Sequence, residues 1–315
     1  MKHKIRLRVK IIFLLIMASC NSNDNNELTT ISKVEEFSLN PNSTGVFKFS
    51  PLGFYSDKEI NVYYHIPLGD VKDLPVLLSL HGANRNADDY RDCWIDMANA
   101  NGFMVFAPEF NDMNFPSGDQ YNLANIFEDG DNPSPETYNS SEKWTFSILD
   151  QLFDHIVKVF DGNQINYNAW GHSAGAQFLH RFIIYQPESK LNIAVCSNAG
   201  WYTVPEKEIS FPYGLNKSQL NDSIIKKAFL KKLHVHLGEE DTNPNSSSLR
   251  HNEIVDAQQG ITRRARGRYF YKTSKENAEL LNSEFNWIKT EEVKNVAHEY
   301  ELMAKDALQY FQKNK

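Results

Sequence analysis

Apolar and polar residues follow two different repeats along this chain. A repeat of two residues in Val46–Ser50 and Ile60–Ile66 predicts half-buried antiparallel strands near the start of the fold. The apolar runs Val76–Leu80 and Phe103–Ala107 predict strands that are buried on both faces. Between these runs, Asp88–Ala100 has the helical spacing that predicts a helix with one apolar face.

The second half of the chain continues this alternation. The predicted helices are Lys143–Phe160, Gln177–Tyr185, Ala257–Leu281 and Leu302–Phe311, and the predicted strands are Ile165–Trp170, Asn192–Asn198, Leu233–Leu237 and Phe285–Val293. Strands that alternate with helices form mostly parallel sheets, because each helix carries the chain back to start the next strand. We therefore expect an α/β fold with a mostly parallel sheet of about eight strands and helices on both faces.

Two long segments, Glu109–Ser141 and Trp201–Asn221, show no clear repeat. Both follow predicted strands, and ligands bind at the carboxyl edge of parallel sheets. Trp201 is a candidate substrate-binding residue, because its ring either stacks on a sugar or packs within the loop. Arg266 belongs to a cluster of three arginines on a predicted helix, which either pairs with an acidic sugar or is a solvated face.

The first nineteen residues have the layout of a secretory signal peptide. Five Lys and Arg residues precede the apolar run Ile11–Met17, which is too short to span a membrane. Met17-Ala18-Ser19-Cys20 resembles the lipobox of bacterial lipoproteins, in which the cysteine is lipidated and becomes the mature N-terminus. The alternative is an ordinary signal peptide that is cleaved nearby.

The lipobox interpretation divides the chain into a signal peptide over residues 1–19, a flexible tether over 20–40 and a folded domain over 41–315. It implies a protein that is lipid-anchored through Cys20 in the bacterial cell envelope, periplasmic or surface-exposed. We expect the folded domain to be a monomer.

Removal of the signal peptide also changes the charge of the protein. Residues 1–19 hold five positive and no acidic residues, so the formal net charge falls from −7 to −12. A domain this acidic is a poor partner for nucleic acid. With Cys20 lipidated, Cys93 and Cys196 remain, and we expect two buried thiols, with a disulfide between them as the alternative.

Candidate chemistry centres on the pentapeptide Gly171-His172-Ser173-Ala174-Gly175. It lies between a predicted strand and a predicted helix, which is the setting of a nucleophile elbow. In such a turn the small neighbours let the serine hydroxyl stand clear of the sheet, where a base activates it. A chain of this size contains the pattern by chance about one time in ten, so Ser173 needs support from other residues.

The oxyanion donors that such a serine needs are present at the expected place. His81-Gly82-Ala83 directly follows the predicted strand Val76–Leu80. A turn there points backbone N–H groups toward the oxygen on which negative charge develops. Ala83 and Ala174 are therefore the candidate donors, although a plain turn at the end of the strand has the same composition.

Asp241 and His298 complete a candidate catalytic triad with Ser173. Asp241 lies in the acidic turn after strand Leu233–Leu237, where the two neighbouring glutamates are better explained as solvated residues. His298 follows the predicted strand Phe285–Val293, which is the position of the general base in this order of residues. The aspartate would orient the imidazole and stabilise its charged form.

The chain contains ten histidines, so the other positions need an explanation. His172 fills the variable position of the elbow, and His234 and His236 lie within a strand, where structural roles are expected. A metal site on these two strand histidines would lack a third ligand at a spacing that is typical of metal-binding motifs. We therefore expect no metal and no cofactor.

Four segments carry a resemblance to a known family: LLSLHGANRN, AWGHSAGAQF, LGEEDTN and VKNVAHEYELM. Over roughly residues 60–315 the chain resembles secreted α/β-hydrolases of the esterase type, related to polyhydroxybutyrate depolymerases and to feruloyl and acetyl-xylan esterases. The resemblance implies the α/β-hydrolase fold, with Ser173, Asp241 and His298 as the triad. Ala83 is a departure, since a cysteine or an aromatic residue often follows the oxyanion His-Gly, and this leaves the substrate class open.

The prediction is a serine carboxylic-ester hydrolase that acts through an acyl-enzyme on acetyl, methyl or feruloyl esters of polysaccharides. One alternative is a serine peptidase of the same fold, although such enzymes usually carry a propeller or cap domain and this chain has no room for a propeller. Another is a non-catalytic, glycan-binding surface lipoprotein. A dienelactone-hydrolase-type enzyme would normally have a cysteine in place of Ser173.

Overall fold

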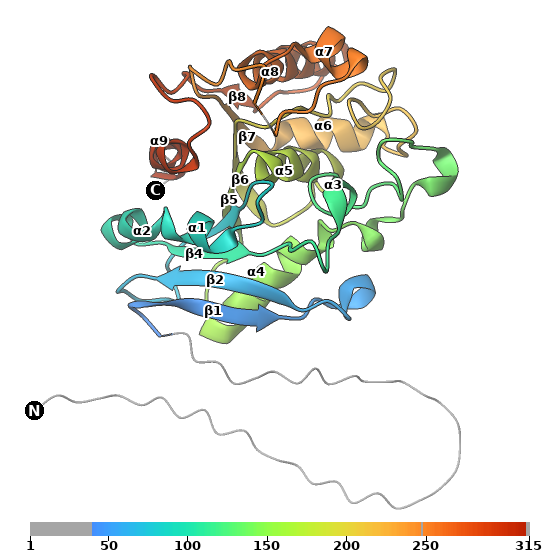
Figure 1. Ribbon diagram of the computed structural model, residues 1–315. Helices are drawn as coiled ribbons and strands as arrows, with labels where there is room; N and C mark the ends of the chain where they lie inside the picture. Colours follow the sequence, from blue (N-terminus) through green and yellow to red (C-terminus); the bar gives the residue numbers. More distant parts are fainter. Residues whose placement is uncertain (1–39, 247, 313–315) are drawn as a thin grey trace, which may run out of the picture. The chain divides into compact units, whose positions relative to one another are not determined.

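The computed structural model describes residues 40–246 and 248–312, and an eight-stranded sheet runs through them (Figure 1). The strands are β1 (Ser43–Phe49), β2 (Ile60–Ile66), β3 (Val76–Leu80), β4 (Met104–Pro108), β5 (Tyr167–His172), β6 (Leu191–Ser197), β7 (Lys232–His236) and β8 (Ile288–Lys289). Their order in the sheet is β1-β2-β4-β3-β5-β6-β7-β8. Strand β2 is antiparallel to both of its neighbours, and the strands from β4 to β8 are parallel. This is the predicted α/β-hydrolase arrangement.

Helices cover both faces of the sheet (Figure 1). They are α1 (Ala87–Asp92), α2 (Ile95–Asn101), α3 (Ser117–Gln120), α4 (Ser147–Phe160), α5 (Ala174–Tyr185), α6 (Asp222–Leu230), α7 (Glu253–Gln259), α8 (Arg263–Leu280) and α9 (Tyr300–Gln312). Helices α1, α2 and α9 pack on one face, and α4, α5, α6 and α8 lie on the other (Figure 1). The described residues belong to one compact unit.

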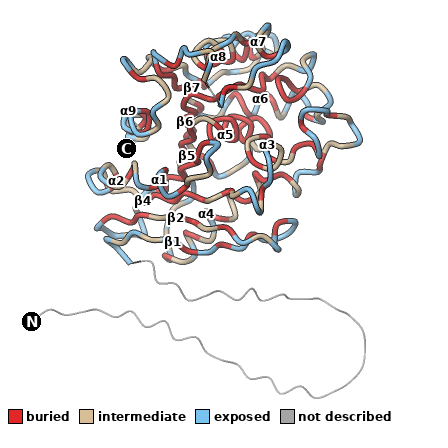
Figure 2. The backbone as a smooth tube through the Cα atoms, viewed as in Figure 1, coloured by how far each residue is buried: buried red, intermediate tan, exposed pale blue. Residues whose placement is uncertain are grey.

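The burial of the strands follows the repeats in the sequence. All five residues of β3 and of β4 are buried, as expected for strands with helices on both sides. In β1, Phe47 and Phe49 are buried while Val46 and Lys48 are exposed, which is the two-residue repeat of an outer strand. All twelve residues of α5 are buried, and Figure 2 shows this helix as part of the buried centre of the fold. The nucleophile elbow is therefore attached to the least accessible helix of its face.

Three predicted elements differ from the structure. The single helix expected over Asp88–Ala100 is divided into α1 and α2, with Cys93 and Trp94 between them. The single helix expected over Ala257–Leu281 is divided into α7 and α8, because Gly260 has a φ of 94° and Thr262 caps α8 by accepting a hydrogen bond from the N–H of Ala265. The strand expected over Phe285–Val293 is reduced to the two residues of β8. Thr290 N–H donates to Val235 O and Val293 N–H donates to Leu237 O, so an extra residue interrupts the ladder.

The two cysteines of the described domain are both free, Cys93 half-buried and Cys196 buried. Burial raises the pKa of both thiols. This agrees with the expectation of two buried thiols rather than a disulfide.

Glycines make the elbow between β5 and α5 possible. A Cβ atom on Gly175 would lie 2.2 Å from Leu80 O and 2.8 Å from His81 O, both at the end of β3. A Cβ atom on Gly171 would lie 2.4 Å from Gly175 O. Strand, turn and helix thus touch through their backbones, and a side chain at either position would force them apart.

Five of the described histidines are buried in the fold, and four of them, at positions 81, 172, 180 and 236, have a lowered pKa. The Nε2 atoms of His81 and His180 accept backbone N–H bonds from Phe110 and Thr203, both at 3.0 Å, and an accepting nitrogen carries no proton. Burial lowers the pKa of His81 to about 3 and also lowers the pKa of the other three below the ordinary value. The folded protein therefore holds these imidazoles neutral.

We predict that Gly175→Ala lowers the free energy of unfolding by about 3 kcal/mol or more, because the new methyl group overlaps the carbonyl of Leu80. Gly53→Ala is the matched control, since Gly53 has a φ of 72° but no atom near its Cβ direction. That control measures the backbone cost alone, about 1 kcal/mol. Urea unfolding of both variants checks this, and equal losses would contradict the overlap.

The buried histidines predict that the protein is destabilised by mild acid. Their pKa values are lower in the folded state than in the unfolded state, so below about pH 6.5 the unfolded chain binds more protons. Each group then removes up to about 1.4 kcal/mol of stability per pH unit. Urea unfolding at about pH 7.5 and about pH 5.5 measures the slope, and His180→Asn should reduce it. A stability that does not change over this interval would disprove the prediction.

Candidate active site

Ser173 occupies a strained turn between β5 and α5. It is the N-terminal cap of the helix, with φ of 54° and ψ of −114°, a backbone conformation that is rare for a residue with a side chain. Its N–H donates to Ser197 O at the end of β6, at 3.0 Å. Such strain costs about 1–3 kcal/mol and is found where the surrounding structure enforces it, typically at functional sites.

His298 and Asp241 form the hydrogen bond that the sequence predicts. His298 Nδ1 lies 2.7 Å from Asp241 Oδ2, and the Asp241 side chain is buried, with 4% of its surface exposed. An ionised carboxylate only accepts, so Nδ1 carries the proton and Nε2 is left as the basic nitrogen. Ser173 and His298 line the same cavity, of about 160 Å³. The fold thus brings these three predicted residues into one site.

The loop after β3 forms another wall of this cavity. Gly82 and Ala83 both line it, and a Cβ atom on Gly82 would lie 3.6 Å from the Cβ of Ser173. Ala174 is the first residue of α5, where N–H groups have no partner within the helix. Both predicted oxyanion donors therefore belong to backbone segments that adjoin the nucleophile.

His81 holds the loop of Gly82 and Ala83 in place through hydrogen bonds. Because its Nε2 accepts from Phe110 N–H, its Nδ1 carries the proton and donates to Gly82 O at 2.9 Å. The Tyr121 hydroxyl donates to His81 O at 2.6 Å. His81 is thus a neutral support of the loop, a role that the motif alone does not reveal.

His172, the variable residue of the elbow, lies against the base. Its ring centroid is 4.4 Å from that of His298, and its Nδ1 is 2.8 Å from the hydroxyl of Tyr90. The ring of Tyr90 stacks on Tyr300, at 4.7 Å. Burial lowers the pKa of His172 well below its ordinary value, so it adds no positive charge beside His298.

Asn198, at the end of β6, joins the two loops that carry the acid and the base. Its Nδ2 donates to Ala297 O at 2.7 Å, and its Oδ1 accepts from Gly238 N–H at 2.8 Å. Asn198 has a φ of 50° and is fully buried. Nothing in the sequence identified this residue, because it belongs to no motif and its partners are backbone atoms far along the chain.

The two candidate substrate-binding side chains are both buried. Trp201 is 3% exposed, and its ring lies between the guanidinium groups of Arg181 and Arg250, at 4.3 and 4.8 Å. Arg266 is fully buried and donates to Gly200 O and to Asp256 Oδ1, both at 2.7 Å. Trp201 therefore packs within its loop, which is one of the two alternatives for this residue, whereas the buried Arg266 corrects the expectation of a surface arginine patch.

The structure also has a larger hollow, of about 800 Å³. Its walls come from three loops and include polar and aromatic residues such as Asn132, Ser210, Tyr213 and Asn252. Ser248 lines the cavity of Ser173 and Arg250 lines the hollow, and two residues of chain span at most about 7 Å. One stretch of chain, from Ser248 to Arg250, therefore borders both spaces.

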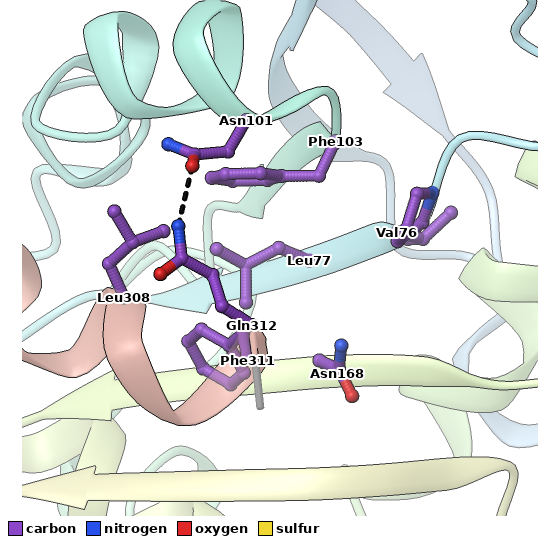
Figure 3. Close-up of a pocket in the computed structure, with 9 residues that line it drawn as sticks. Val76, Leu77, Asn101, Phe103, Asn168, Leu308, Phe311 and Gln312 are labelled. Carbon is purple, nitrogen blue, oxygen red and sulfur yellow. Dashed lines mark hydrogen bonds between the residues drawn. The ribbon is translucent and has the colours of Figure 1, made fainter. Parts of the chain in front are cut away.

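Another, smaller hollow of about 30 Å³ lies near the amino ends of the parallel strands. Figure 3 shows Val76 and Asn168, near the amino ends of β3 and β5, together with Leu308 and Phe311 of α9. Ser173 follows the carboxyl end of β5, so this hollow is separate from the active site.

Within residues 40–246 and 248–312, no group of three or more His, Cys, Asp or Glu residues is arranged to hold a metal ion. No helix in this part of the chain is long and apolar enough to cross a membrane.

No protein-family model matches the chain, and no curated protein matches it in sequence. Among solved structures, poly(aspartic acid) hydrolase-1 from Sphingomonas sp. KT-1 is 34% identical, with a TM-score of 0.80 over 86% of this chain and 98% of that protein. LpqC, a poly(3-hydroxybutyrate) depolymerase from Bordetella parapertussis, is 26% identical, with a TM-score of 0.78 over 87% of this chain and 91% of that protein.

An S-formylglutathione hydrolase from Agrobacterium tumefaciens shares the fold at 14% identity, with a TM-score of 0.55 over 86% of this chain and 93% of that protein. The two more similar structures are both hydrolases, and the alignment to the first spans nearly all of that protein. This chain is therefore a hydrolase of the α/β-hydrolase fold and belongs to the same family as the Sphingomonas poly(aspartic acid) hydrolase-1.

Proposed function

We propose that the protein is a serine hydrolase that cleaves carboxylic esters, with Ser173 as the nucleophile, His298 as the general base and Asp241 as the residue that orients the base. The 2.7 Å contact between His298 Nδ1 and Asp241 Oδ2 carries the proposal, because His298 shares a cavity with a serine held in a strained elbow. A binding protein without catalysis would have no use for that strain.

The chemistry follows from these positions. His298 Nε2 takes the proton of Ser173 as its Oγ attacks the ester carbonyl, and the resulting oxyanion accepts hydrogen bonds from the N–H groups of Ala83 and Ala174. His298 then gives the proton to the leaving alcohol, and water releases the acid from the acyl-enzyme by the same steps. Removal of one oxyanion donor costs roughly a hundredfold to a thousandfold in rate in comparable enzymes.

We propose ester substituents of polysaccharides, acetyl, methyl or feruloyl, as the substrate class. The support is a cavity of about 160 Å³ at Ser173 and a hollow of about 800 Å³, because the stretch of chain from Ser248 to Arg250 borders both. The amide, hydroxyl and aromatic side chains of the larger hollow suit a hydroxylated chain.

A second candidate is hydrolysis of the backbone of a polymer rather than of its substituents. Two observations favour it: the 34% identity to a poly(aspartic acid) hydrolase and the 26% identity to a poly(3-hydroxybutyrate) depolymerase. The units of poly(aspartic acid) are joined by amide bonds. The same triad serves amide and ester bonds, because both pass through a tetrahedral oxyanion.

We further propose that the mature protein is a monomer, lipid-anchored through Cys20 in the bacterial cell envelope. The support is the signal layout of residues 1–19 and the Met17-Ala18-Ser19-Cys20 sequence.

Ser173→Ala should lower the rate of p-nitrophenyl acetate turnover by roughly 10⁴-fold or more. It should also abolish labelling by a fluorophosphonate probe. Asp241→Asn should lower kcat by about 10⁴-fold, because the imidazole loses its orientation. Ser56→Ala is the control: Ser56 is an exposed serine that precedes β2, so this variant should keep its labelling at Ser173. Labelling of the Ser173→Ala protein would refute the proposed nucleophile.

A panel of polymers distinguishes the two substrate classes. If ester substituents are the substrate, acetylated, methylated or feruloylated oligosaccharides release acid or alcohol while the sugar chain keeps its length. If the polymer backbone is the substrate, poly(aspartic acid) or poly(3-hydroxybutyrate) is shortened and the oligosaccharides are unchanged. Size-exclusion chromatography and measurement of released acid separate these outcomes, with the Ser173→Ala protein as the blank.

A further inference from the structure

Arg263 is a buried cation that contacts the acid of the triad. It is the first residue of α8, and its side chain is 1% exposed. One guanidinium nitrogen lies 3.4 Å from Asp241 Oδ1 and 3.0 Å from Ser246 Oγ, and the other terminal nitrogen lies 2.8 Å from Ser248 Oγ. Since His298 contacts Oδ2, the two oxygens of one carboxylate are divided between a cation and the base.

The start of α8 also holds the main chain of Asp241. The N–H of Arg264 donates to Asp241 O at 3.2 Å, and Thr262 caps the helix by accepting from Ala265 N–H. The main-chain carbonyl of Asp241 therefore faces the positive end of an eighteen-residue helix, and its carboxylate contacts a guanidinium group. Both contacts hold Asp241 in place.

The electrostatic effect of Arg263 reaches beyond Asp241. Burial lowers the pKa of the guanidinium while Asp241 opposes that shift, and Arg263 also contributes to the lowered pKa of His172. A guanidinium group stays protonated in proteins, so this positive charge is permanent. Because the pair is buried, solvent and salt screen it little.

The charged and titratable groups around His298 come from several elements. Asp241 lies on the loop after β7, His172 on β5, Tyr300 at the start of α9, and Glu299 next to His298 in the chain. The negative carboxylate of Asp241 and the positive guanidinium of Arg263 therefore act on this imidazole with opposite signs.

We propose that Arg263 is a positioning residue of the hydrolytic site. It holds the Asp241 carboxylate with Oδ2 toward His298 and places a positive charge beside this pair. Through hydrogen bonds to Ser246 and Ser248 it also links the segment of these serines to Asp241, and Ser248 lines the cavity. This inference rests on the proposed function of Ser173, Asp241 and His298.

The test is the pH dependence of kcat/KM for p-nitrophenyl acetate, measured between about pH 5 and about pH 9 and normalised to fluorophosphonate-labelled sites. In Arg263→Gln the midpoint of the acid limb should rise by about one pH unit, because His298 is protonated more easily without the opposing charge. Arg268→Gln is the matched control, an arginine of the same helix whose side chain is 53% exposed and paired with Glu292, and its midpoint should stay at the wild-type value. A purely structural role would lower the plateau and leave the midpoint unchanged, and that result would overturn the inference.

Arg263→Lys keeps the positive charge but cannot span Asp241, Ser246 and Ser248 together. It should keep the wild-type midpoint and lower kcat about tenfold with little change in KM. If Arg263→Gln does not fold, this variant decides: a raised midpoint, or a kcat equal to that of the wild type, would overturn the inference. Failure of the proposed function is recognised separately, because wild-type activity would then survive Ser173→Ala.

Discussion

The contact between the first turn of α5 and the end of β3 is the constraint on which the active site depends. Gly175 lies so close to Leu80 O that even a methyl group would overlap it, and Gly171 meets the same turn of helix. The chain can pass from strand to helix there only through the strained conformation of Ser173. Complete burial of α5 and the bond from Ser173 N–H to Ser197 O offset that strain, so the position of the nucleophile follows from packing of the central sheet.

The base is positioned by contacts on the other face of the sheet. His298 lies just before α9, and that helix is tied to the sheet by Asp306, whose carboxylate is 3.0 Å from His236 Nε2. His236 Nδ1 lies 2.8 Å from Ser197 Oγ, which also accepts a bond from the indole of Trp170. Asn198 then links the loop of His298 to the turn that carries Asp241. The triad thus depends on β5, β6, β7, α8 and α9, so its geometry is a property of the whole sheet.

Strands and helices with a strong apolar pattern were predictable. Every residue of β3, β4 and α5 is buried, and such elements consist mostly of apolar residues. The edge of the sheet was less predictable: β8 has one neighbour, and an extra residue interrupts its ladder after Lys289. The break between α7 and α8 was visible in the sequence as Gly260 and Thr262, but helical periodicity on both sides concealed it. Arg266 was misplaced, and the two alternatives for Trp201 stayed open, because their sequence surroundings say nothing of the loops that cover them.

The sequence by itself determined the order of the elements and indicated Ser173, Asp241 and His298 as the candidate triad. It did so because a nucleophile elbow needs glycines at set positions, and because parallel strands bring their carboxyl ends to one edge of the sheet. Only the tertiary structure decided what surrounds them: the neutral His81 beneath the loop of Gly82, His172 against the base, Asn198 between two loops, and Arg263 on the carboxylate of Asp241. These contacts join residues far apart in the chain through backbone atoms and buried charges, and no local pattern records such partners.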